Sequence, residues 1–419
     1  MSSGTETDLA SGYRQTREAT TSLVSSLSPE DCAAQSMEDA SPAKWHLAHT
    51  TWFFETFVLA AADPEYAPFD PAYRYLFNSY YNTVGEQYPR PRRGLLTRPD
   101  LATIRRYRDS VDEALAERLA AGGLPEALLE VIELGIHHEE QHQELLLTDI
   151  LHLLSLNPLR PAYRENLEAP DQGTPAPLSW QRGAEGIQSI GHRGGGFGFD
   201  NESPRHKILV PAHELASRLV CNADFLEFME DGGYTTPELW LSEGWSLCAQ
   251  EGWKAPLYWE RIDGHWQNFG LGGLSPLVPD EPVCHVSFFE ADAFARWAGA
   301  RLPTEAEWEL AAGQPAATDN LFDERRLRPR GAGPSEASLP RQLFGDVWEW
   351  TASPYQAYPG YRPGPGAVGE YNGKFMANQF VLRGGSCVTP RGHIRASYRN
   401  FFPAHARWQW SGLRLARDA

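Results

Sequence analysis

Residues 124–156, LPEALLEVIELGIHHEEQHQELLLTDILHLLSL, decide the fold of the first half of the chain. Apolar residues recur along this segment at helical spacing, which predicts one long helix. His138 and His142 lie one turn apart on the stripe that also holds Leu134 and Leu145, so both imidazoles face the apolar side. Two inward histidines at this spacing are typical of a metal chelate, and a hydrogen-bonded pair of core histidines is the structural alternative.

Three more helices are predicted before this one, at residues 8–27, 42–62 and 100–121. Four helices joined by one long connection, residues 63–99, indicate a four-helix bundle. Within the second helix, His49 shares an apolar stripe with two tryptophans and a phenylalanine, so it is a candidate third metal ligand. His46 is a further possibility, but it lies off that stripe.

Three neutral nitrogen ligands leave coordination positions open, and they suit zinc and iron(II) equally. The string His138 to His142 also matches H-E-x-x-H, in which Glu139 would be the general base of a zinc protease. That alternative needs a third ligand downstream, and the adjoining helix is too close to fold back onto the same ion. His137 lies about 100° off the inward stripe and is interpreted as structural.

Length, charge and cysteine usage narrow the class of protein. At about 150 residues per domain, 419 residues predict two to three domains. No apolar run approaches the 18 or so residues of a membrane-spanning helix, and the first residues lack the features of a signal peptide, so we expect a cytoplasmic protein. A net charge of −18 argues against nucleic acid and anionic membranes as partners. Five scattered cysteines without C-x-x-C predict neither a disulfide framework nor a zinc ribbon.

Composition divides the chain into two halves. Twelve of the 14 tryptophans and 29 of the 37 glycines lie after residue 179. We therefore expect a helical domain at 1–160, a proline-rich linker at 161–180 and a second domain at 181–419. The second domain reads as mixed α+β, with helices near 222–230 and 288–299 and a third at 304–312.

Two further segments carry candidate functional residues. The long connection contains the pair Tyr80 and Tyr81 and a group of arginines, Arg90, Arg92 and Arg93, that could clamp a carboxylate. Packing tyrosines and a solvated basic loop are the plainer alternatives. In the second half, Asn400 precedes Phe401 and Phe402, which could line an aromatic pocket for a cationic ligand or form part of the core.

Several motifs, in order, resemble known domains. LAHTTWFFE (47–55) and HHEEQHQELLLTD (137–149) resemble the metal-binding helices of a DinB-like bundle. The second half resembles the sulfatase-modifying-factor domain, a C-type-lectin-like fold, through PTEAEWE (303–309), GDVWEWT (345–351), VLRGGS (381–386) and GLRLA (412–416). The two domains in this order resemble the ergothioneine-biosynthesis sulfoxide synthases, the EgtB family, over residues 40–419.

This resemblance implies an iron(II) enzyme whose metal is held by His49, His138 and His142. Members of the family join a thiol to C2 of the imidazole of hercynine (Nα-trimethylhistidine), use O2, and leave a sulfoxide. Holding both organic substrates beside one metal makes their encounter effectively intramolecular. A tyrosine hydroxyl could protonate the reduced oxygen species.

The chain departs from one type of the family and resembles another. In the first type the catalytic tyrosine precedes the VLRGGS-like segment, where this chain has GAVGEYNGKFM (366–376) with Tyr371 as its sole tyrosine. That type also has Asn-Trp-Asp where this chain has Asn-Phe-Phe, and its Asp helps to hold γ-glutamylcysteine. FNSYYN and PRPRRGLL resemble the second type, which favours free cysteine. The second type implies Tyr80 and Tyr81 as the catalytic pair, Arg90 and Arg93 for the carboxylate of the thiol substrate, Gln141 for the hercynine imidazole, and Asn400, Phe401 and Phe402 for the hercynine pocket.

Other activities stay open at this point. A selenoneine-type synthase would take a selenosugar donor, and a DinB-type thiol transferase would use zinc and no O2. An ovothiol-type reaction on unmethylated histidine usually comes with an extra methyltransferase domain. Formylglycine-generating enzymes carry a cysteine pair after RGGS, whereas Cys387 stands alone here, which argues against copper–thiolate chemistry. Oligomeric state is not predicted by any of these features.

Overall fold

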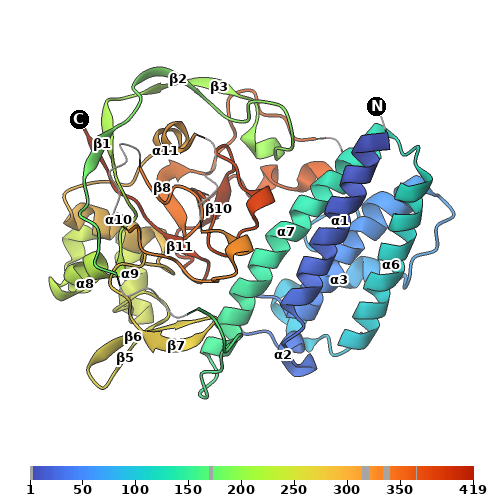
Figure 1. Cartoon of the computed structure of the whole chain (residues 1–419), viewed down its shortest axis with the longest axis horizontal. Helices are drawn as coiled ribbons and strands as arrows, with labels where there is room; N and C mark the ends of the chain where they lie inside the picture. Colours follow the sequence, from blue (N-terminus) through green and yellow to red (C-terminus); the bar gives the residue numbers. More distant parts are fainter. Residues whose placement is uncertain (1–2, 169–172, 314–319, 334–339, 365) are drawn as a thin grey trace. The chain divides into compact units, whose positions relative to one another are not determined.

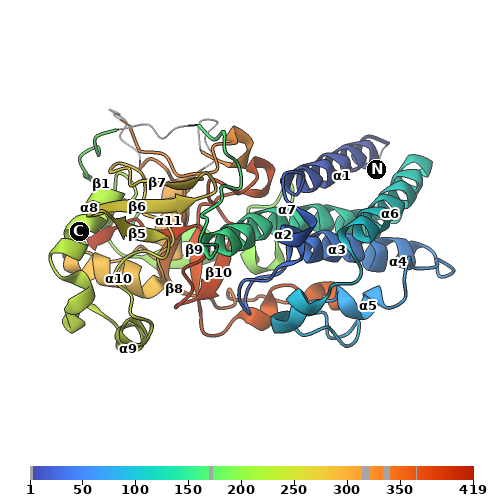
Figure 2. The ribbon, with the colours of Figure 1, turned by 90° about the horizontal axis from the view of Figure 1, so that it is seen from below.

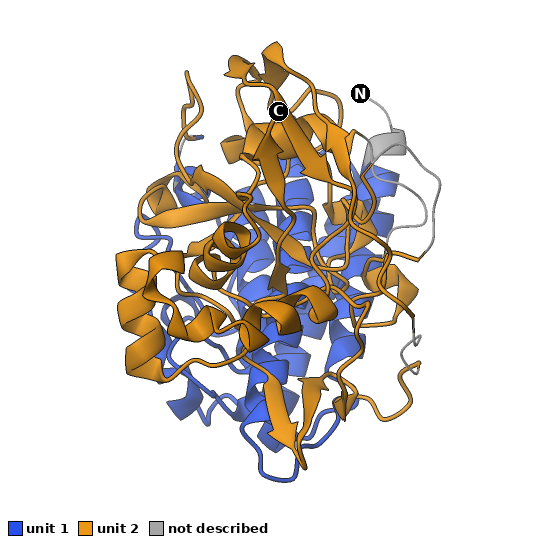
Figure 3. Cartoon of the chain, turned by 90° about the vertical axis from the view of Figure 1, so that its left-hand side faces the viewer, with its two compact units in different colours: residues 1–163, 364–371 blue, residues 164–363, 372–419 orange. Residues whose placement is uncertain are grey.

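The computed structural model describes residues 3–168, 173–313, 320–333, 340–364 and 366–419. The chain forms two compact units, coloured separately in Figure 3. Unit 1 is Met1–Tyr163 with Gly364–Tyr371, and unit 2 is Arg164–Pro363 with Asn372–Ala419. The boundary after Tyr163 lies within the predicted 161–180 linker, part of which (169–172) is outside the described residues. The first unit is helical and the second contains the sheets, which confirms the predicted two-domain α+β class.

Four long helices of unit 1 lie side by side as a bundle (Figure 1). They are α1 (Ser3–Leu23), α3 (Ala43–Phe54), α6 (Leu101–Ala121) and α7 (Glu126–Ser155). The first begins and ends earlier than the predicted 8–27. Local sequence explains the ends of α6: the Asp100 side chain accepts a hydrogen bond from the Thr103 amide, and Gly122 follows the last turn with a φ of 71°. The short helices of this unit are α2 (Pro29–Ala33), α4 (Ala60–Ala62) and α5 (Tyr73–Leu76).

Helix α3 is the central helix of unit 1. All twelve of its residues are buried, and it packs against both α6 and α7. A helix that is buried on every side lies within a core. After Phe54 the chain continues through a π-helical turn, Glu55–Leu59, into α4, so the predicted helix 42–62 is one continuous element with a wider turn inside it.

Charged side chains connect the helices inside the bundle. Arg17 of α1 donates to Glu139 of α7 (2.8 Å) and to Asp112 of α6 (2.7 Å). Its remaining nitrogen donates to Thr51 of α3 at 2.9 Å, and Arg108 of α6 also binds Glu139. Burial alone would raise the pKa of Glu139, but Arg108 and Arg17 lower it to about 2. The carboxylate is therefore ionised and compensated, which is the condition under which a charge is tolerated in a core.

The connection between α4 and α6 is ordered by side-chain hydrogen bonds and includes α5, seen from below in Figure 2. Asn78 accepts from the Tyr81 amide at 3.1 Å and donates to the Tyr81 carbonyl at 3.1 Å, which closes a tight turn around the tyrosine pair. Residues 364–371 of the second half belong to this unit as well. The Glu370 carboxylate accepts from the amides of Asn82 (3.0 Å) and Thr83 (2.9 Å).

Unit 2 is built from small sheets and short helices. Its sheets have the strand orders β1-β4-β12, β10-β9-β8-β11, β2-β3 and β5-β6-β7. In the four-stranded sheet, β9 is antiparallel to both β8 and β10, and β11 is parallel to β8. The strands are β1 (Trp180–Arg182), β2 (Gly186–Ile190), β3 (His206–Val210), β4 (His213–Ala216), β5 (Trp259–Ile262), β6 (His265–Gly270), β7 (Gly273–Pro276), β8 (Trp348–Pro354), β9 (Gln379–Arg383), β10 (Asn400–Pro403), β11 (Ser411–Gly412) and β12 (Ala416–Asp418).

The three helices predicted in the second half are present as α8 (Asn222–Glu230), α10 (Phe288–Trp297) and α11 (Glu305–Ala312). A fourth, α9 (Ser242–Glu251), was not predicted. Its N-cap residue, Leu241, provides no side-chain cap, and Gly244 weakens the helical signal in its first turn. Gly244 is explained by packing, because a Cβ there would lie 2.6 Å from the Phe289 ring. Tertiary contact therefore supports the first turn of this helix, and Gly252, with a φ of 66°, ends it.

Buried ion pairs join the motifs of unit 2 to one another. Glu305 of PTEAEWE accepts from Arg383 of VLRGGS at 2.7 Å, and Glu349 of GDVWEWT accepts from Arg414 of GLRLA at 2.9 Å. All four side chains are buried. The motifs are distinctive because each supplies one half of a buried charge pair whose loss would leave the other half uncompensated. All five cysteines are buried and free. Across the described ranges, no helix is both long and apolar enough to cross a membrane.

The close contact of α3 and α7 yields a stability prediction. A Cβ built on Gly135 of α7 would lie 2.5 Å from the Phe54 ring and 2.9 Å from the Phe53 ring. Gly135→Ala should therefore lower the free energy of unfolding by about 1–3 kcal/mol through overpacking. Chemical denaturation followed by circular dichroism measures this change.

Gly12→Ala in α1 is the matched control, since its Cβ would meet Ile136 at an ordinary 3.7 Å. The intrinsic helix propensity of alanine should make this control more stable, by up to about 1 kcal/mol. Equal midpoints for Gly135→Ala and the wild type would contradict the tight packing of α3 on α7.

Candidate metal centre

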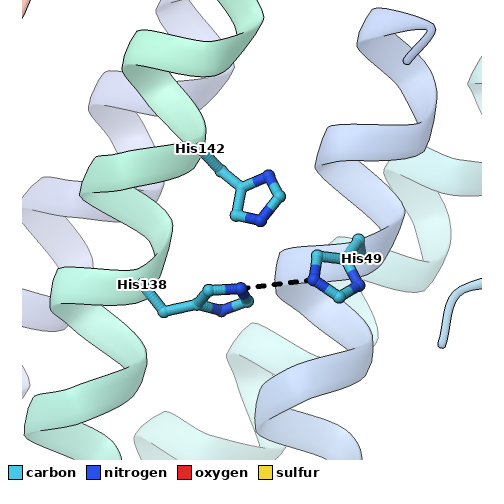
Figure 4. Close-up of side chains that lie close together, drawn as sticks. All are labelled: His49, His138 and His142. Atoms are coloured by element: carbon cyan, nitrogen blue, oxygen red, sulfur yellow. Dashed lines mark hydrogen bonds between the residues drawn. The ribbon is translucent and has the colours of Figure 1, made fainter. Parts of the chain in front are cut away.

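Three histidine side chains from two helices converge inside unit 1 (Figure 4). His49 comes from α3, and His138 and His142 come from successive turns of α7. One nitrogen from each ring lies within 4.8 Å of the other two, and the Nε2 atoms of His49 and His138 are 3.2 Å apart. All three side chains are buried. These are the three histidines that the sequence names as candidate ligands, and the structure brings them together.

The electrostatics of these histidines suit metal binding. Burial lowers the pKa of His138 to about 3, and burial together with the neighbouring imidazoles lowers the pKa of His49 and His142 well below the ordinary value. The rings are therefore neutral near pH 7, and a neutral imidazole is the form that coordinates a metal. The Nδ1 atom of His49 lies 2.6 Å from the Phe77 carbonyl oxygen, which can only accept. The proton of His49 is consequently on Nδ1, and Nε2 keeps its lone pair.

Aromatic rings enclose the histidines on several sides. Trp45 stacks on His49 with ring centroids 4.5 Å apart, and Trp52 stacks on it at 5.6 Å. Phe53 contacts His138 at 4.8 Å. These rings exclude water from the ligands and hold their orientation, because buried aromatic side chains have few rotamers.

The protease alternative fails on the position of Glu139. Both of its carboxylate oxygens are engaged by Arg17 and Arg108 inside the bundle. A general base must be free to accept a proton from the substrate or water, whereas this carboxylate is ion-paired with two arginines. His137, interpreted from the sequence as structural, binds Glu140 at 2.8 Å.

The two predicted tyrosines lie near the histidines through shared aromatic neighbours. The ring of Tyr81 is 5.6 Å from Trp52 and 6.3 Å from Phe53, both of which contact the ligand histidines. Tyr80 lies 4.7 Å from Tyr81. Burial raises the pKa of the Tyr81 hydroxyl well above its ordinary value, so this phenol keeps its proton at physiological pH.

Tyr371 also lies near the histidines, although it is not among the predicted catalytic residues. Its hydroxyl donates to the Gln141 side-chain oxygen, and its ring is 5.6 Å from His138 and 6.2 Å from Tyr80. Glu370, its neighbour in sequence, binds the turn that follows the tyrosine pair. The signal available beforehand was its place: Tyr371 is the sole tyrosine of the segment before VLRGGS, where the first type of the family has its catalytic tyrosine.

The two predicted arginines differ in position. The Arg93 guanidinium stacks on Trp45, with 3.4 Å between its central carbon and the ring centroid, and donates to Ser41 (2.9 Å) and Ser79 (3.1 Å). Burial and the charge of Arg90 lower the pKa of Arg93, which indicates a cation short of negative charge. Arg90 is exposed and donates to the Asp39 carbonyl. Arg93 therefore contacts Trp45, the ring that stacks on His49, whereas Arg90 is exposed to solvent.

The predicted hercynine residues of the second half lie in strand β10 of unit 2. Asn400 accepts a hydrogen bond from the Phe401 amide at 2.9 Å. The Phe401 ring stacks on Tyr355 at 4.1 Å and lies 5.9 Å from Phe375, and Phe402 pairs with Phe380 of β9. These contacts are internal to unit 2 and hold the strand in place.

Comparisons with known proteins agree with this architecture. The DinB superfamily matches residues 13–146, and the Sulfatase-modifying factor enzyme 1-like domain matches residues 181–419. The chain is 33% identical to a hercynine oxygenase of Mycobacterium tuberculosis, with 90% of this chain and 91% of the relative covered. It is 38% identical to that of Mycolicibacterium smegmatis over 68% of this chain and 71% of the relative. It is 27% identical to ergothioneine biosynthesis protein 1 of Schizosaccharomyces pombe, over 53% of this chain and 28% of the relative.

The fold and the site thus define a two-domain protein with a DinB-type histidine centre and a sulfatase-modifying-factor-like domain. More narrowly, the chain belongs to the hercynine oxygenase family. It is an oxygenase by that membership.

The low pKa of His138 predicts how the metal-free protein responds to acid. Unfolded histidine takes up a proton near pH 6.5, whereas folded His138 does so near 3. Between these values the unfolded state binds more protons, so the free energy of unfolding rises with pH and falls on acidification. One such histidine contributes about 1.4 kcal/mol per pH unit.

Urea denaturation between pH 6 and pH 4 checks this prediction. When the free energies of unfolding of the wild type and His138→Gln are subtracted, the contributions of the titrating groups that both proteins share cancel. On acidification the free energy of unfolding should fall more steeply for the wild type than for the variant. The two slopes should differ by the equivalent of up to about one bound proton. Parallel profiles would show that His138 titrates normally in the folded protein.

Proposed function

We propose that this protein is an iron(II)- and O2-dependent sulfoxide synthase. It joins the sulfur of cysteine to C2 of the hercynine imidazole and gives hercynylcysteine sulfoxide, a step of ergothioneine biosynthesis. The observation that carries the proposal is the set of three buried, neutral histidines with adjacent phenols, in a chain of the hercynine oxygenase family. Hercynine, cysteine and O2 are its proposed small-molecule partners.

His49, His138 and His142 would hold the iron. One buried nitrogen of each ring lies within 4.8 Å of the other two, an arrangement that a cation coordinated by all three would satisfy. Iron(II) with three protein nitrogen ligands supplies the one-electron chemistry and the open positions that O2-dependent reactions need. The surrounding tryptophan and phenylalanine rings keep bulk water from the reacting groups.

Arg93 supports the assignment of an amino-acid thiol. It is a buried cation that stacks on Trp45 and whose side-chain partners, Ser41 and Ser79, are both neutral. A substrate carboxylate would supply the missing charge and fix the thiol beside the ligands. Arg90 is proposed as the weaker contributor, since it is exposed.

The tyrosine hydroxyls support a role in proton transfer. Tyr81 keeps its proton at pH 7 and can donate it, with Tyr80 at van der Waals distance as its partner in the pair. Gln141, held by Tyr371, is proposed to contact the hercynine imidazole. Asn400, Phe401 and Phe402 are proposed to serve the trimethylammonium end, for which aromatic faces are suited. The five free cysteines suit a reducing compartment, and we propose a cytoplasmic location.

A direct assay tests the proposed reaction. The full-length protein is loaded with iron(II) without oxygen and then given O2, hercynine and cysteine. Mass spectrometry should find hercynylcysteine sulfoxide, and an oxygen electrode should record O2 uptake that requires both organic substrates. No product from fully loaded protein, under conditions where a known hercynine oxygenase works, would refute the proposal.

Parallel reactions separate the alternatives. γ-Glutamylcysteine and a selenosugar replace cysteine in two of them, and we expect cysteine to have the highest kcat/KM. Preference for the selenosugar would identify a selenoneine-type synthase. Thiol transfer by the zinc-loaded protein without O2 uptake would instead identify a DinB-type thiol transferase.

The tyrosine assignment makes a separate prediction. Tyr80→Phe and Tyr81→Phe should bind iron as the wild type does, while the variant that removes the acting phenol forms sulfoxide about 10²-fold more slowly. Tyr371→Phe is tested beside them because its ring lies nearest to His138. Product quantification and iron content are measured on the same samples.

Tyr66→Phe is the control, because the Tyr66 hydroxyl bonds Glu55 (3.3 Å) and contacts none of the ligands. It should retain wild-type activity. Wild-type rates in Tyr80→Phe, Tyr81→Phe and their double variant would refute the assignment of the pair.

A further inference from the structure

His46 and Asp149 form a histidine–carboxylate pair next to His142, one of the proposed metal ligands. The Nδ1 atom of His46 lies 2.8 Å from Nδ1 of His142, and Nε2 of His46 lies 3.0 Å from Oδ2 of Asp149. The same Asp149 oxygen accepts the Ser41 amide hydrogen at 2.7 Å. His46, His142 and Asp149 are all buried. The ligand is thus linked through His46 to a carboxylate two turns further along α7.

The direction of these hydrogen bonds follows from the chemistry of each group. The Asp149 oxygen accepts from the Ser41 amide, and as an acceptor it requires His46 to carry its proton on Nε2. A neutral imidazole has one donor and one acceptor nitrogen, so Nδ1 of His46 accepts. His142 must then donate from Nδ1, which leaves the lone pair of its Nε2 free. In Figure 4 one ring nitrogen of His142 points toward the other two imidazoles and the other points away.

The three ligands are oriented to different degrees. His49 is fixed by the Phe77 carbonyl, and His142 is fixed by His46 and Asp149. His138 has no hydrogen-bond partner at Nδ1 within the described residues. Two ligands with a fixed tautomer would therefore form a preorganised pair to which the third adds.

His46 is unsuited to be a ligand itself. Both of its ring nitrogens are already engaged, and it is not among the three histidines whose nitrogen atoms converge. It lies one turn before His49 on α3, so it approaches the centre from behind His142. Its position matches that of an outer group that holds a ligand rather than that of a ligand.

We propose that His46 and Asp149 are positioning residues of the metal centre. They fix the tautomer and ring orientation of His142 so that its Nε2 is presented to the metal before the metal binds. The proposal rests on the proposed function, because it takes the three histidines to be a metal site. Outer-shell partners of this kind change metal affinity by about 10–100-fold when they are removed.

Metal affinity of the full-length protein tests this proposal without any turnover. Cobalt(II) is the probe, its affinity measured by competition with a chromophoric chelator and its ligand-field spectrum recorded. His46→Leu should weaken cobalt binding about 10–100-fold and alter the spectrum. His46→Asn keeps an oxygen near the position of Nδ1 that can accept from His142, so it should recover part of the affinity. Asp149→Asn should fall between His46→Leu and the wild type, because its amide oxygen still accepts but carries no charge.

His206→Leu is the control, since His206 lies in β3 of unit 2 and its Nδ1 bonds the Pro204 carbonyl at 3.1 Å. Its cobalt affinity should equal that of the wild type. Thermal unfolding of each metal-free variant shows whether it is folded, and an unfolded His46→Leu leaves the comparison of His46→Asn and Asp149→Asn with the wild type to decide.

The outcomes separate this inference from the proposed function. Cobalt affinities within twofold of wild type in the folded His46 and Asp149 variants would overturn the positioning role. Equal losses in His46→Leu and His46→Asn that only follow their loss of thermal stability would also overturn it. A wild-type protein that binds no divalent metal would refute the proposed function itself.

Discussion

A helical bundle that carries histidines, arginines and a glutamate on its inner faces must provide each of them with a partner. The packing of α3 on α7 meets this constraint and divides the polar groups into two sets. On one side Glu139 is neutralised by Arg17 and Arg108, and on the other the histidines face each other. Adjacent residues of one helix therefore have opposite roles. Glu139 holds the bundle together, and His138 keeps a lone pair for a cation.

The same constraint explains why the converging histidines could be predicted and their surroundings could not. The candidate ligands follow from helical periodicity, since a spacing of four residues places His138 and His142 on one face of their helix. His49 follows from its apolar stripe. The role of Glu139 depends on Arg17 and Arg108, which come from two other helices, so no local pattern carries it. His46, a further possible ligand, lies off that stripe, and from this position it reaches Asp149.

Features that depend on residues far apart in the sequence could not be predicted from local patterns, for the same reason. Helix α9 lacks a side-chain cap at its start and contains Gly244, which packs on Phe289, so its first turn depends on tertiary contact although Gly252 marks its end. Tyr371 reaches the histidines because residues 364–371 leave the second half of the chain and join unit 1. In contrast, the motifs of unit 2 were conspicuous in the sequence. Their glutamates and arginines are complementary halves of buried ion pairs. Few other residue types could take their places without leaving a buried charge uncompensated.

The membership of residues 364–371 in unit 1 has a consequence for how the protein is made. A chain leaves the ribosome from its N-terminus, and domains generally fold as they emerge. The histidines of α3 and α7 are available once residue 163 has appeared, but Glu370 and Tyr371 emerge some 200 residues later. The bundle is thus completed only after most of the second unit has been translated. A gene fragment that ends at the apparent domain boundary encodes the three converging histidines without the segment that binds the turn after the tyrosine pair.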